Sequence, residues 1–479
     1  MTRTVLLLGS GFVAKPVLFY FKRFPNYHVL IATNDQKTGE KLHKAYSEMS
    51  SLFVFDVTKR ENILPLIKKS DVVISLLPYS LHPTIARFCI DASKHLVTSS
   101  YISPELEKLN QECQSRNLII LNEMGLDPGI DHIATMKIKD DIEQRGGKIV
   151  GFRSFCGALT SPECLDNPLA YKFTWSPAGV INAISDAQYL ENGKVVRIPR
   201  EDLLYNIGSL KTSNALNLLY YPNRDSVKYK KTYGFEHTQS LIRGTVRFPG
   251  FIETLTALFE LGLTKKETPI AKTWFETVRP LIASQSPAAP LFTPADLENA
   301  RRWLGLASGQ IQPGQLLNAI STNHHWAKMT PVQRSERARR AIEGLAFLGL
   351  FNPNLAIADP KTTLFDNLVA LMSSKMLFKR SDRDLVVLTL EFDVEFDTGA
   401  RELTEFKLIM TGDSDDLTAV EKGVGMTAAV AAKLIIDGKV QKRGVIGPFS
   451  PDVYNPAFKE LTELGLIVEA VTHSFPPKL

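Results

Sequence analysis

The strongest constraint on the fold lies at the N-terminus, where a short apolar run ends in a glycine-rich turn. Residues 4–8 are typical of a β-strand, residues 9–14 read Gly-Ser-Gly-Phe-Val-Ala, and residues 15–21 favour a helix. In a dinucleotide-binding βαβ unit, the first glycine makes the turn and the second lets the backbone approach a pyrophosphate. The small third residue, here Ala14, allows close packing of helix on strand. We therefore predict a pyrophosphate site at residues 9–14; a plain tight turn is the alternative.

The same alternation of strand and helix continues through about 120 residues. Each apolar run is rich in Val, Ile and Leu, which suits a parallel sheet covered on both faces. Each run is followed by polar residues or glycine, and ligands bind at the carboxyl ends of such strands. We therefore predict an α/β protein with a Rossmann-type parallel sheet. The six strand candidates cover residues 4–8, 28–32, 52–55, 71–77, 95–98 and 117–121.

The remainder of the 479 residues favours two further parts. We expect a Rossmann-type domain at residues 1–130, completed by 415–479. A second, mixed-sheet α/β domain is expected at 131–250 and 377–414, carrying the substrate site and the dimer interface. It includes a β-hairpin at 384–396 and 401–411 and a long loop at 156–175. Residues 251–376 read as successive helices and are expected to form an all-α insertion domain.

Composition excludes several classes of protein. The net charge is +5, with 56 basic and 51 acidic residues, which is too slight to indicate nucleic acid or an anionic membrane as a partner. No apolar run approaches the ~18 to 20 residues that span a bilayer. We expect a cytoplasmic protein, or one in an organelle reached without a cleaved leader.

The cysteines and histidines show no metal-binding spacing, and we expect neither a metal site nor structural disulfides. His132 follows Asp131 into a predicted helix, so capping or packing is its expected role. The basic cluster at 334–340 lies on a predicted helix and is expected to be a solvated face.

Cofactor choice is expected to depend on Thr33, Asn34 and Asp35, at the end of the second strand. A carboxylate there bonds the ribose 2′-hydroxyl, whereas a basic side chain accommodates a 2′-phosphate. Asp35 with no adjacent arginine slightly favours NAD, and Asn34 and Lys37 leave NADP open; a simple turn role is the alternative for Asp35. Asp56 and Val57 end the third strand, where adenine commonly binds.

Several motifs in order along the chain resemble one enzyme family. They are Gly9 to Val13, Val73 to Tyr79, Ser100 to Pro104, Gly125 to His132, Asn167 to Leu169, Tyr171 to Ser176 and Tyr221 to Ser226. Together these blocks resemble saccharopine dehydrogenase of the glutamate-forming type, also called saccharopine reductase. Weaker similarity at 243–245 and 444–449 extends the resemblance over almost the whole chain.

The resemblance implies reversible NAD(P)-dependent oxidation of the secondary amine of saccharopine, giving glutamate and 2-aminoadipate 6-semialdehyde in lysine metabolism. It implies substrate contacts at Ser100, Tyr101, Asp127, Asn223, Arg224, Asp225 and Ser226. It implies cofactor contacts at Ser10, Gly11, Phe12, Val13, Thr33, Asn34, Asp56, Val57, Leu77, Ser99, Ser100, Leu126, Asp127 and Ser176, to which the glycine turn and the strand end add Gly9 and Asp35.

These residue types suit a substrate with three carboxylates and two amines. Arg224 and Arg243 can each bind a carboxylate through two hydrogen bonds. Asp127 can pair with an ammonium group, and Asp127 and Cys156 are the candidates for acid-base catalysis. The alternative is that Asp127 only binds and Cys156 only packs, so that orientation of cofactor and substrate does most of the work.

The sequence departs from the family pattern at two places. Fungal members have an arginine where this chain has Asn34, so a preference for NADP does not carry over. Ala158 and Thr160 replace a glycine and a proline in the expected loop, which leaves open a related amino-acid or polyamine amine as substrate. A non-catalytic NAD(P)-binding regulator is the competing class. The expected partners are a small molecule and a second copy of the chain in a homodimer.

Overall fold

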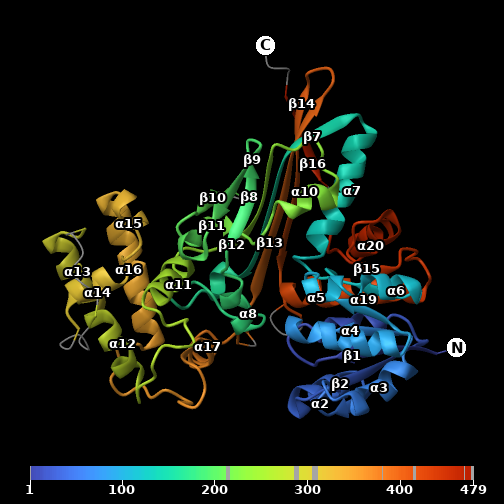
Figure 1. Cartoon of the computed structure of the whole chain (residues 1–479), viewed down its shortest axis with the longest axis horizontal. Coiled ribbons are helices and arrows are strands. Elements are labelled where there is room, and N and C mark those ends of the chain that lie inside the picture. The colour runs from blue at the N-terminus through green and yellow to red at the C-terminus, as the bar shows by residue number, and fades with distance from the viewer. Residues whose placement is uncertain are drawn as a thin grey trace. The chain divides into compact units, whose positions relative to one another are not determined.

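The computed structural model describes residues 2–211, 216–284, 291–304, 311–379, 381–413, 417–468 and 470–475. It divides into two compact units (Figure 1). The first comprises Met1–Cys156, Lys228–Ser240 and Asp384–Leu479, and the second comprises Gly157–Val227 and Leu241–Arg383. Across the described ranges, we find no helix with the length and apolar character needed to cross a membrane.

A seven-stranded parallel sheet forms the base of the first unit, in the order β15-β6-β5-β4-β1-β2-β3. Its strands are β1 (Arg3–Leu8), β2 (Tyr27–Thr33), β3 (Ser50–Val54), β4 (Val72–Ser75), β5 (His95–Thr98), β6 (Ile119–Leu121) and β15 (Gly444–Ile446). The six predicted strands are therefore confirmed, and the C-terminal part of the chain adds β15 beside β6. This is the predicted Rossmann-type sheet.

The helices of this unit cover both faces of the sheet, because its strands are apolar on both sides. Alternate residues such as Leu6, Val73 and Leu96 pack with α3 (Arg60–Lys69) and α4 (His82–Asp91) in one core. On the sheet's other side are α1 (Lys15–Phe21) and α19 (Thr427–Ile436), which pack against each other. The further helices are α2 (Gln36–Ala45), η1 (Tyr79–Leu81), α5 (Pro104–Glu107), α6 (Asn110–Ser115), α18 (Ala419–Glu421), the π-helical η4 (Lys422–Met426) and α20 (Pro451–Glu463).

The rest of the first unit consists of α7 (Ile130–Gln144), α10 (Lys228–Tyr233) and long antiparallel strands. The predicted hairpin is confirmed as β13 (Asp384–Phe396) and β14 (Arg401–Thr411), which pair from Leu385↔Thr411 to Glu395↔Arg401. β16 (Val471–Phe475) pairs with β14 on its free edge. β7 (Gly147–Thr160) begins in this unit and ends in the second.

The second unit combines short antiparallel strands with successive helices. Its strands are β8 (Ala187–Glu191), β9 (Lys194–Ile198), β10 (Gly208–Leu210), β11 (Leu218–Pro222) and β12 (Ser240–Arg247). Its helices are η2 (Pro162–Cys164), α8 (Pro177–Asn182), α9 (Arg200–Leu203), α11 (Phe251–Glu260), α12 (Trp274–Ala283), α13 (Pro294–Leu304), α14 (Pro313–Ala319), α15 (His325–Lys328), α16 (Pro331–Leu348) and α17 (Leu364–Lys375). The helical reading of residues 251–376 is thus confirmed, and a single core that includes Trp274 and Trp326 unites them.

Two local predictions were wrong. Residues 156–160 continue β7 instead of starting the long loop. Arg337 is buried rather than solvated, because its guanidinium donates to the Leu204 carbonyl at 3.1 Å and to Thr256 Oγ1 at 2.8 Å. The domain boundaries expected from the sequence stay a prediction, and the one at 414/415 falls outside the described residues.

Candidate active site

The glycine turn after β1 leaves room for a ligand beside the backbone. Gly9 has a φ of +98°, which favours glycine, and its N–H donates to the Ala32 carbonyl at 2.9 Å. A Cβ atom at Gly11 would meet no protein atom within 4 Å. Packing inside this unit therefore does not explain why residue 11 is a glycine. The open backbone fits the close approach of a dinucleotide pyrophosphate.

Hydroxyl groups and one carboxylate gather where β2 ends. Ser10 Oγ donates to Thr33 Oγ1 at 2.9 Å and lies 2.6 Å from Thr38 Oγ1. Asp35 caps α2 by accepting from the Thr38 backbone N–H at 3.1 Å, and this bond is the main cause that lowers its pKa. Asp35 is therefore an exposed, ionised carboxylate at the strand end where a ribose is expected.

Most of the other predicted cofactor residues follow strands of the same sheet. The Asp56 carboxylate accepts from Thr58 Oγ1 at 2.7 Å and from its N–H at 2.9 Å, and these bonds lower its pKa. Val57 is buried and Phe12 is half exposed. Leu77 and Ser99 follow β4 and β5, and the side chain of Leu126 lies against Gly423 of η4. Ser176 belongs to the second unit, where it caps α8.

Two of the predicted substrate residues are joined by a hydrogen bond within the first unit. Tyr101 Oη donates to Asp127 Oδ1 at 2.9 Å. Lys228 Nζ lies 5.7 Å from the centroid of the Tyr101 ring and 4.9 Å from that of Tyr229. The Asp127 carboxylate thus accepts from the Tyr101 phenol, and the Lys228 ammonium group lies near the Tyr101 and Tyr229 rings.

The Ser100 hydroxyl forms a hydrogen bond with the buried, neutral His82. Its Oγ lies 3.0 Å from His82 Nε2, and His82 Nδ1 lies 3.1 Å from Ser75 Oγ. Burial lowers the pKa of His82 to about 4. The imidazole is therefore uncharged near pH 7 and orients two serine hydroxyls.

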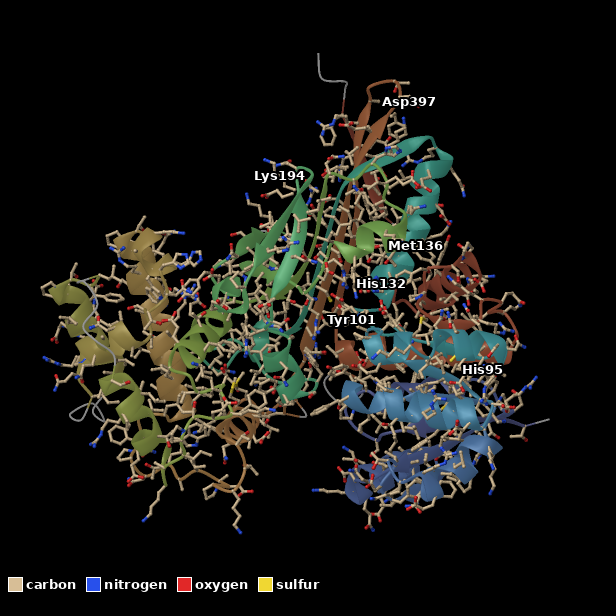
Figure 2. All side chains as sticks on the ribbon, viewed as in Figure 1. His95, Tyr101, His132, Met136, Lys194 and Asp397 are labelled. Carbon is tan, nitrogen blue, oxygen red and sulfur yellow. The ribbon has the colours of Figure 1, made fainter. Side chains whose placement is uncertain are left out.

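A buried polar cluster supports the loops that carry Tyr101 and Asp127. It is formed by Glu123, Asp131, His132 and Tyr233. His132 Nε2 is 2.9 Å from Glu123 Oε2, and its Nδ1 is 2.7 Å from Tyr233 Oη and 3.3 Å from Asp131 Oδ2. His132 has no exposed surface. Figure 2 shows His132 on α7 close to Tyr101, with Met136 one turn further along the helix. We refer to these four residues as the His132 cluster.

The His132 cluster fixes both loops that carry Tyr101 and Asp127. Glu123, at φ +60°, donates its N–H to the Ser100 carbonyl at 3.0 Å and accepts from the Ile102 N–H at 3.2 Å. Asp131 Oδ1 accepts from the Gly129 N–H at 2.7 Å, two residues after Asp127. Burial works to raise the pKa of Glu123, but His132 and the Ile102 N–H outweigh it, and the pKa is lowered. The cluster therefore braces the pair with a charged carboxylate.

Sequence reasoning included His132 in a motif but missed its partners. The packing role predicted for it is confirmed, since it is enclosed by Tyr229, Tyr233 and Phe449 rings. The available signal was two acidic residues flanking a glycine turn, at Glu123 and Asp131. The aromatic partners come from segments about 100 and 300 residues further along the chain, which no local pattern indicates.

Most of the predicted substrate residues of the second unit are linked to one another through their backbone. The Arg243 N–H donates to Ser226 Oγ at 2.9 Å, and the Asn223 N–H donates to the Arg243 carbonyl at 2.8 Å. Arg224 is exposed at φ +51°, and Asp225 Oδ1 accepts from the Val227 N–H at 2.9 Å. Arg243 itself is buried. Cys156 is buried, forms no disulfide and ends the first stretch of the first unit.

The parallel sheet, the open glycine turn and the polar strand ends define a dinucleotide-binding protein. Family models agree, since residues 5–121 match the saccharopine dehydrogenase NADP binding domain and residues 125–466 match the saccharopine dehydrogenase C-terminal domain. The chain belongs to the saccharopine dehydrogenase family.

Individual relatives match over nearly the whole chain. The chain is 33% identical to saccharopine dehydrogenase [NADP(+), L-glutamate-forming] of Saccharomyces cerevisiae, over 97% of both chains. It is 32% identical to the mitochondrial alpha-aminoadipic semialdehyde synthase of Rattus norvegicus, over 97% of this chain and 47% of that protein. The solved apo structure of saccharopine dehydrogenase (L-Glu forming) from Saccharomyces cerevisiae superimposes with a TM-score of 0.81 over 99% of this chain and 100% of that one, at 32% identity.

Proposed function

We propose that this chain reversibly oxidises the secondary amine of saccharopine with NAD(P), giving glutamate and 2-aminoadipate 6-semialdehyde in lysine metabolism. The observation that carries the proposal is the Tyr101–Asp127 hydrogen bond in a dinucleotide-binding unit of this family. A carboxylate held by a phenol suits a substrate that carries two amines. A regulator that only senses the dinucleotide has no need of such a pair.

The chemistry has two steps, and the cofactor supplies the hydride acceptor. The amine nitrogen first loses its proton, and a hydride then leaves the carbon of the lysine-derived half, which makes a C=N bond. Water adds to that carbon, and the C–N bond breaks to release the aldehyde and the amine of glutamate. We infer that Asp127 accepts and returns protons at its carboxylate, and that the hydrogen bond from Tyr101 holds it in place.

Acid-base help of this kind contributes about 10²- to 10⁴-fold, while orientation of two reactants contributes more. Asp127→Asn is therefore expected to lower kcat by about 10²-fold or more if Asp127 transfers protons. Cys156→Ser tests the second candidate, and its buried thiol predicts a smaller effect. Near-normal kcat for both variants would leave orientation as the main source of catalysis.

Arg224 and Arg243 stay the proposed partners of the substrate carboxylates. Replacing a guanidinium that binds a carboxylate should raise KM more than it lowers kcat. Arg224→Ala is the cleaner test because Arg224 is exposed, whereas Arg243 is buried and its loss would disturb packing.

We infer that NAD and NADP bind the same site and that Asp35 favours NAD there. Its exposed carboxylate, ionised through its bond with Thr38, would repel a 2′-phosphate. We expect Asp35→Ala to raise the ratio of kcat/KM with NADP to that with NAD, and Asn34→Arg to raise it further. The NADP(+) in the name of the yeast relative makes this ratio the informative quantity.

The altered loop gives little reason to prefer another amine as substrate. Thr160 is buried, and its Oγ1 accepts from the Lys172 N–H at 2.8 Å, so its hydroxyl serves the second unit's own backbone. A homodimer and a cytoplasmic location stay predictions from the sequence; light scattering of the purified protein would test the first.

The function is tested by measuring saccharopine-dependent reduction of NAD and NADP side by side. We expect activity with at least one of them, and expect none when a polyamine replaces saccharopine. Absence of activity with both cofactors would contradict the proposal.

A further inference from the structure

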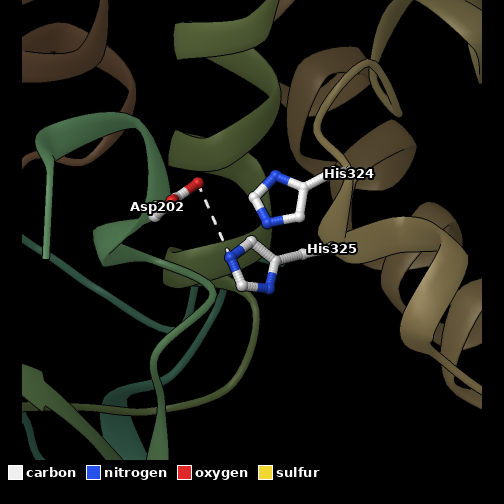
Figure 3. Close-up of side chains that lie close together, drawn as sticks. All are labelled: Asp202, His324 and His325. Carbon is white, nitrogen blue, oxygen red and sulfur yellow. Dashed lines mark ion pairs between the residues drawn. The ribbon is translucent and has the colours of Figure 1, made fainter.

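Two histidines and an aspartate of the second unit, none of them among the candidate residues above, lie close together. The ligand atoms of Asp202, His324 and His325 all lie within 4.8 Å of one another. His325 Nε2 is 3.6 Å from Asp202 Oδ1, and the two imidazole centroids are 4.2 Å apart. Figure 3 shows both rings on one segment, with the Asp202 carboxylate facing them from another. We refer to these three residues as the His325 cluster.

The positions of these donors are fixed by neighbouring groups. The His325 ring stacks on Tyr205 with centroids 5.1 Å apart and an interplanar angle of 11°. Tyr205 Oη accepts from Trp326 Nε1 at 2.7 Å and bonds the Glu260 carboxylate. The imidazole of His325 therefore rests on an aromatic ring that is itself held in place.

Asn323 links the two sides of the His325 cluster. Its Nδ2 donates to Asp202 Oδ1 at 2.9 Å, and its Oδ1 accepts from the backbone N–H of His325 at 3.0 Å. Such outer hydrogen bonds are the usual means of orienting metal ligands. They position the carboxylate toward the imidazoles without using up the imidazole nitrogens.

The contacts between the three side chains do not satisfy them. A separation of 3.6 Å is too long for a good hydrogen bond between His325 and Asp202. Neutral imidazole nitrogens and a carboxylate oxygen are a donor set that Zn²⁺ takes with three protein ligands and a water. His324 is exposed and the other two residues are half-buried, so water can reach a fourth position.

We propose that Asp202, His324 and His325 bind a divalent transition-metal ion of the Zn²⁺ type. The ion would join α9 to the segment at α15, about 120 residues further along the chain. Because the ion binds the folded protein, it would stabilise the second unit by mass action. The site shares no residue with the candidate dinucleotide site, so its test does not require the enzyme to be active.

The test uses full-length protein without a histidine tag, treated with a chelator and then freed of it. Titration with ZnCl₂ followed by calorimetry should give one equivalent of tight binding, and MgCl₂ should give none. His324→Ala and Asp202→Asn should each weaken Zn²⁺ binding by about 100-fold or more, since loss of an outer-shell partner alone costs about 10- to 100-fold. His237→Ala removes an exposed histidine of the first unit and serves as the matched control.

A second readout protects the result against misfolding of a variant. Co²⁺ bound to the wild-type protein should give the visible absorption of a four-coordinate ion, and Zn²⁺ should displace it. Absence of Zn²⁺ binding by the wild type, or binding that is equal in His324→Ala and His237→Ala, would overturn the proposal.

Discussion

The two histidine clusters use the same side chains in opposite ways. His132 is fully buried in the first unit, and Glu123, Asp131 and Tyr233 surround its two ring nitrogens. His324 and His325 of the second unit are partly exposed, and the closest carboxylate to His325 stays 3.6 Å away. In the first case protein groups lie within 3.3 Å of both ring nitrogens, and in the second the donors lie close together with a longer separation between them.

The difference indicates that histidine serves two functions in this protein, one structural and one in binding. A buried histidine between carboxylates braces the surrounding loops, because breaking such a cluster leaves a charge without compensation. Histidines with accessible nitrogens can bind a ligand that brings its own charge. The surroundings of each ring therefore separate a structural role from a binding role.

The largest effect is expected from His132→Ala. The substitution leaves the Glu123 and Asp131 carboxylates buried without the imidazole and should lower the free energy of unfolding by about 3 kcal/mol or more. Because Glu123 and Asp131 hold the loops of Tyr101 and Asp127, kcat/KM for saccharopine should fall as well. Chemical unfolding and steady-state kinetics measure the two losses.

His237→Ala, at an exposed position, should leave both quantities unchanged. A His132→Ala protein as stable and as active as the wild type would show that the His132 cluster braces nothing.

The second-largest effect is a loss of stability at low pH, which we expect from the buried, neutral His82. His82 has a pKa of about 4 in the folded protein and an ordinary value of 6.5, so the unfolded chain binds a proton that the folded chain does not. Its contribution to stability is present above pH 6.5 and is lost as the pH falls toward 4. Between pH 7 and pH 5 the loss should reach about 2 kcal/mol.

The measurement compares unfolding of the wild type and His82→Gln at both pH values. The advantage of the wild type should shrink at pH 5. An advantage that is the same at both would contradict a neutral buried His82.

The smallest effect is expected at the His325 cluster without metal. His324→Ala alters an exposed side chain, so in the presence of chelator the free energy of unfolding should change by no more than about 0.5 kcal/mol. With saturating Zn²⁺, only the wild type should gain stability. A large loss in chelator would mean that this cluster braces the unit as the His132 cluster does.

Local patterns predict the elements of this fold well, because apolar runs and helix signals act within a few residues. The strand at 95–98 and the hairpin strands at 384–396 and 401–411 match their predicted bounds. β15 needed the tertiary structure, since three residues near the C-terminus pair with β6 more than 300 positions earlier. Arg337 was misread because its acceptors, Leu204 and Thr256, lie far away in the sequence.

The candidate site divides in the same way. The turn at Gly9 and the end of β2 before Asp35 could be predicted because both are local features, and the roles of these residues in cofactor binding stay predictions. The partners of His132 could not, because they come from α7, α10 and the loop after β6. The His325 cluster was missed because its spacing of 202 to 324–325 fits no metal motif; the sequence indicated no metal site at all.

The most direct test of the proposed activity is the identity of the products. Purified protein is incubated with saccharopine and NAD or NADP, and glutamate, aldehyde and reduced cofactor are quantified together. We predict one glutamate and one 2-aminoadipate 6-semialdehyde for each cofactor reduced. Release of lysine and 2-oxoglutarate instead, or of no product, would contradict the account.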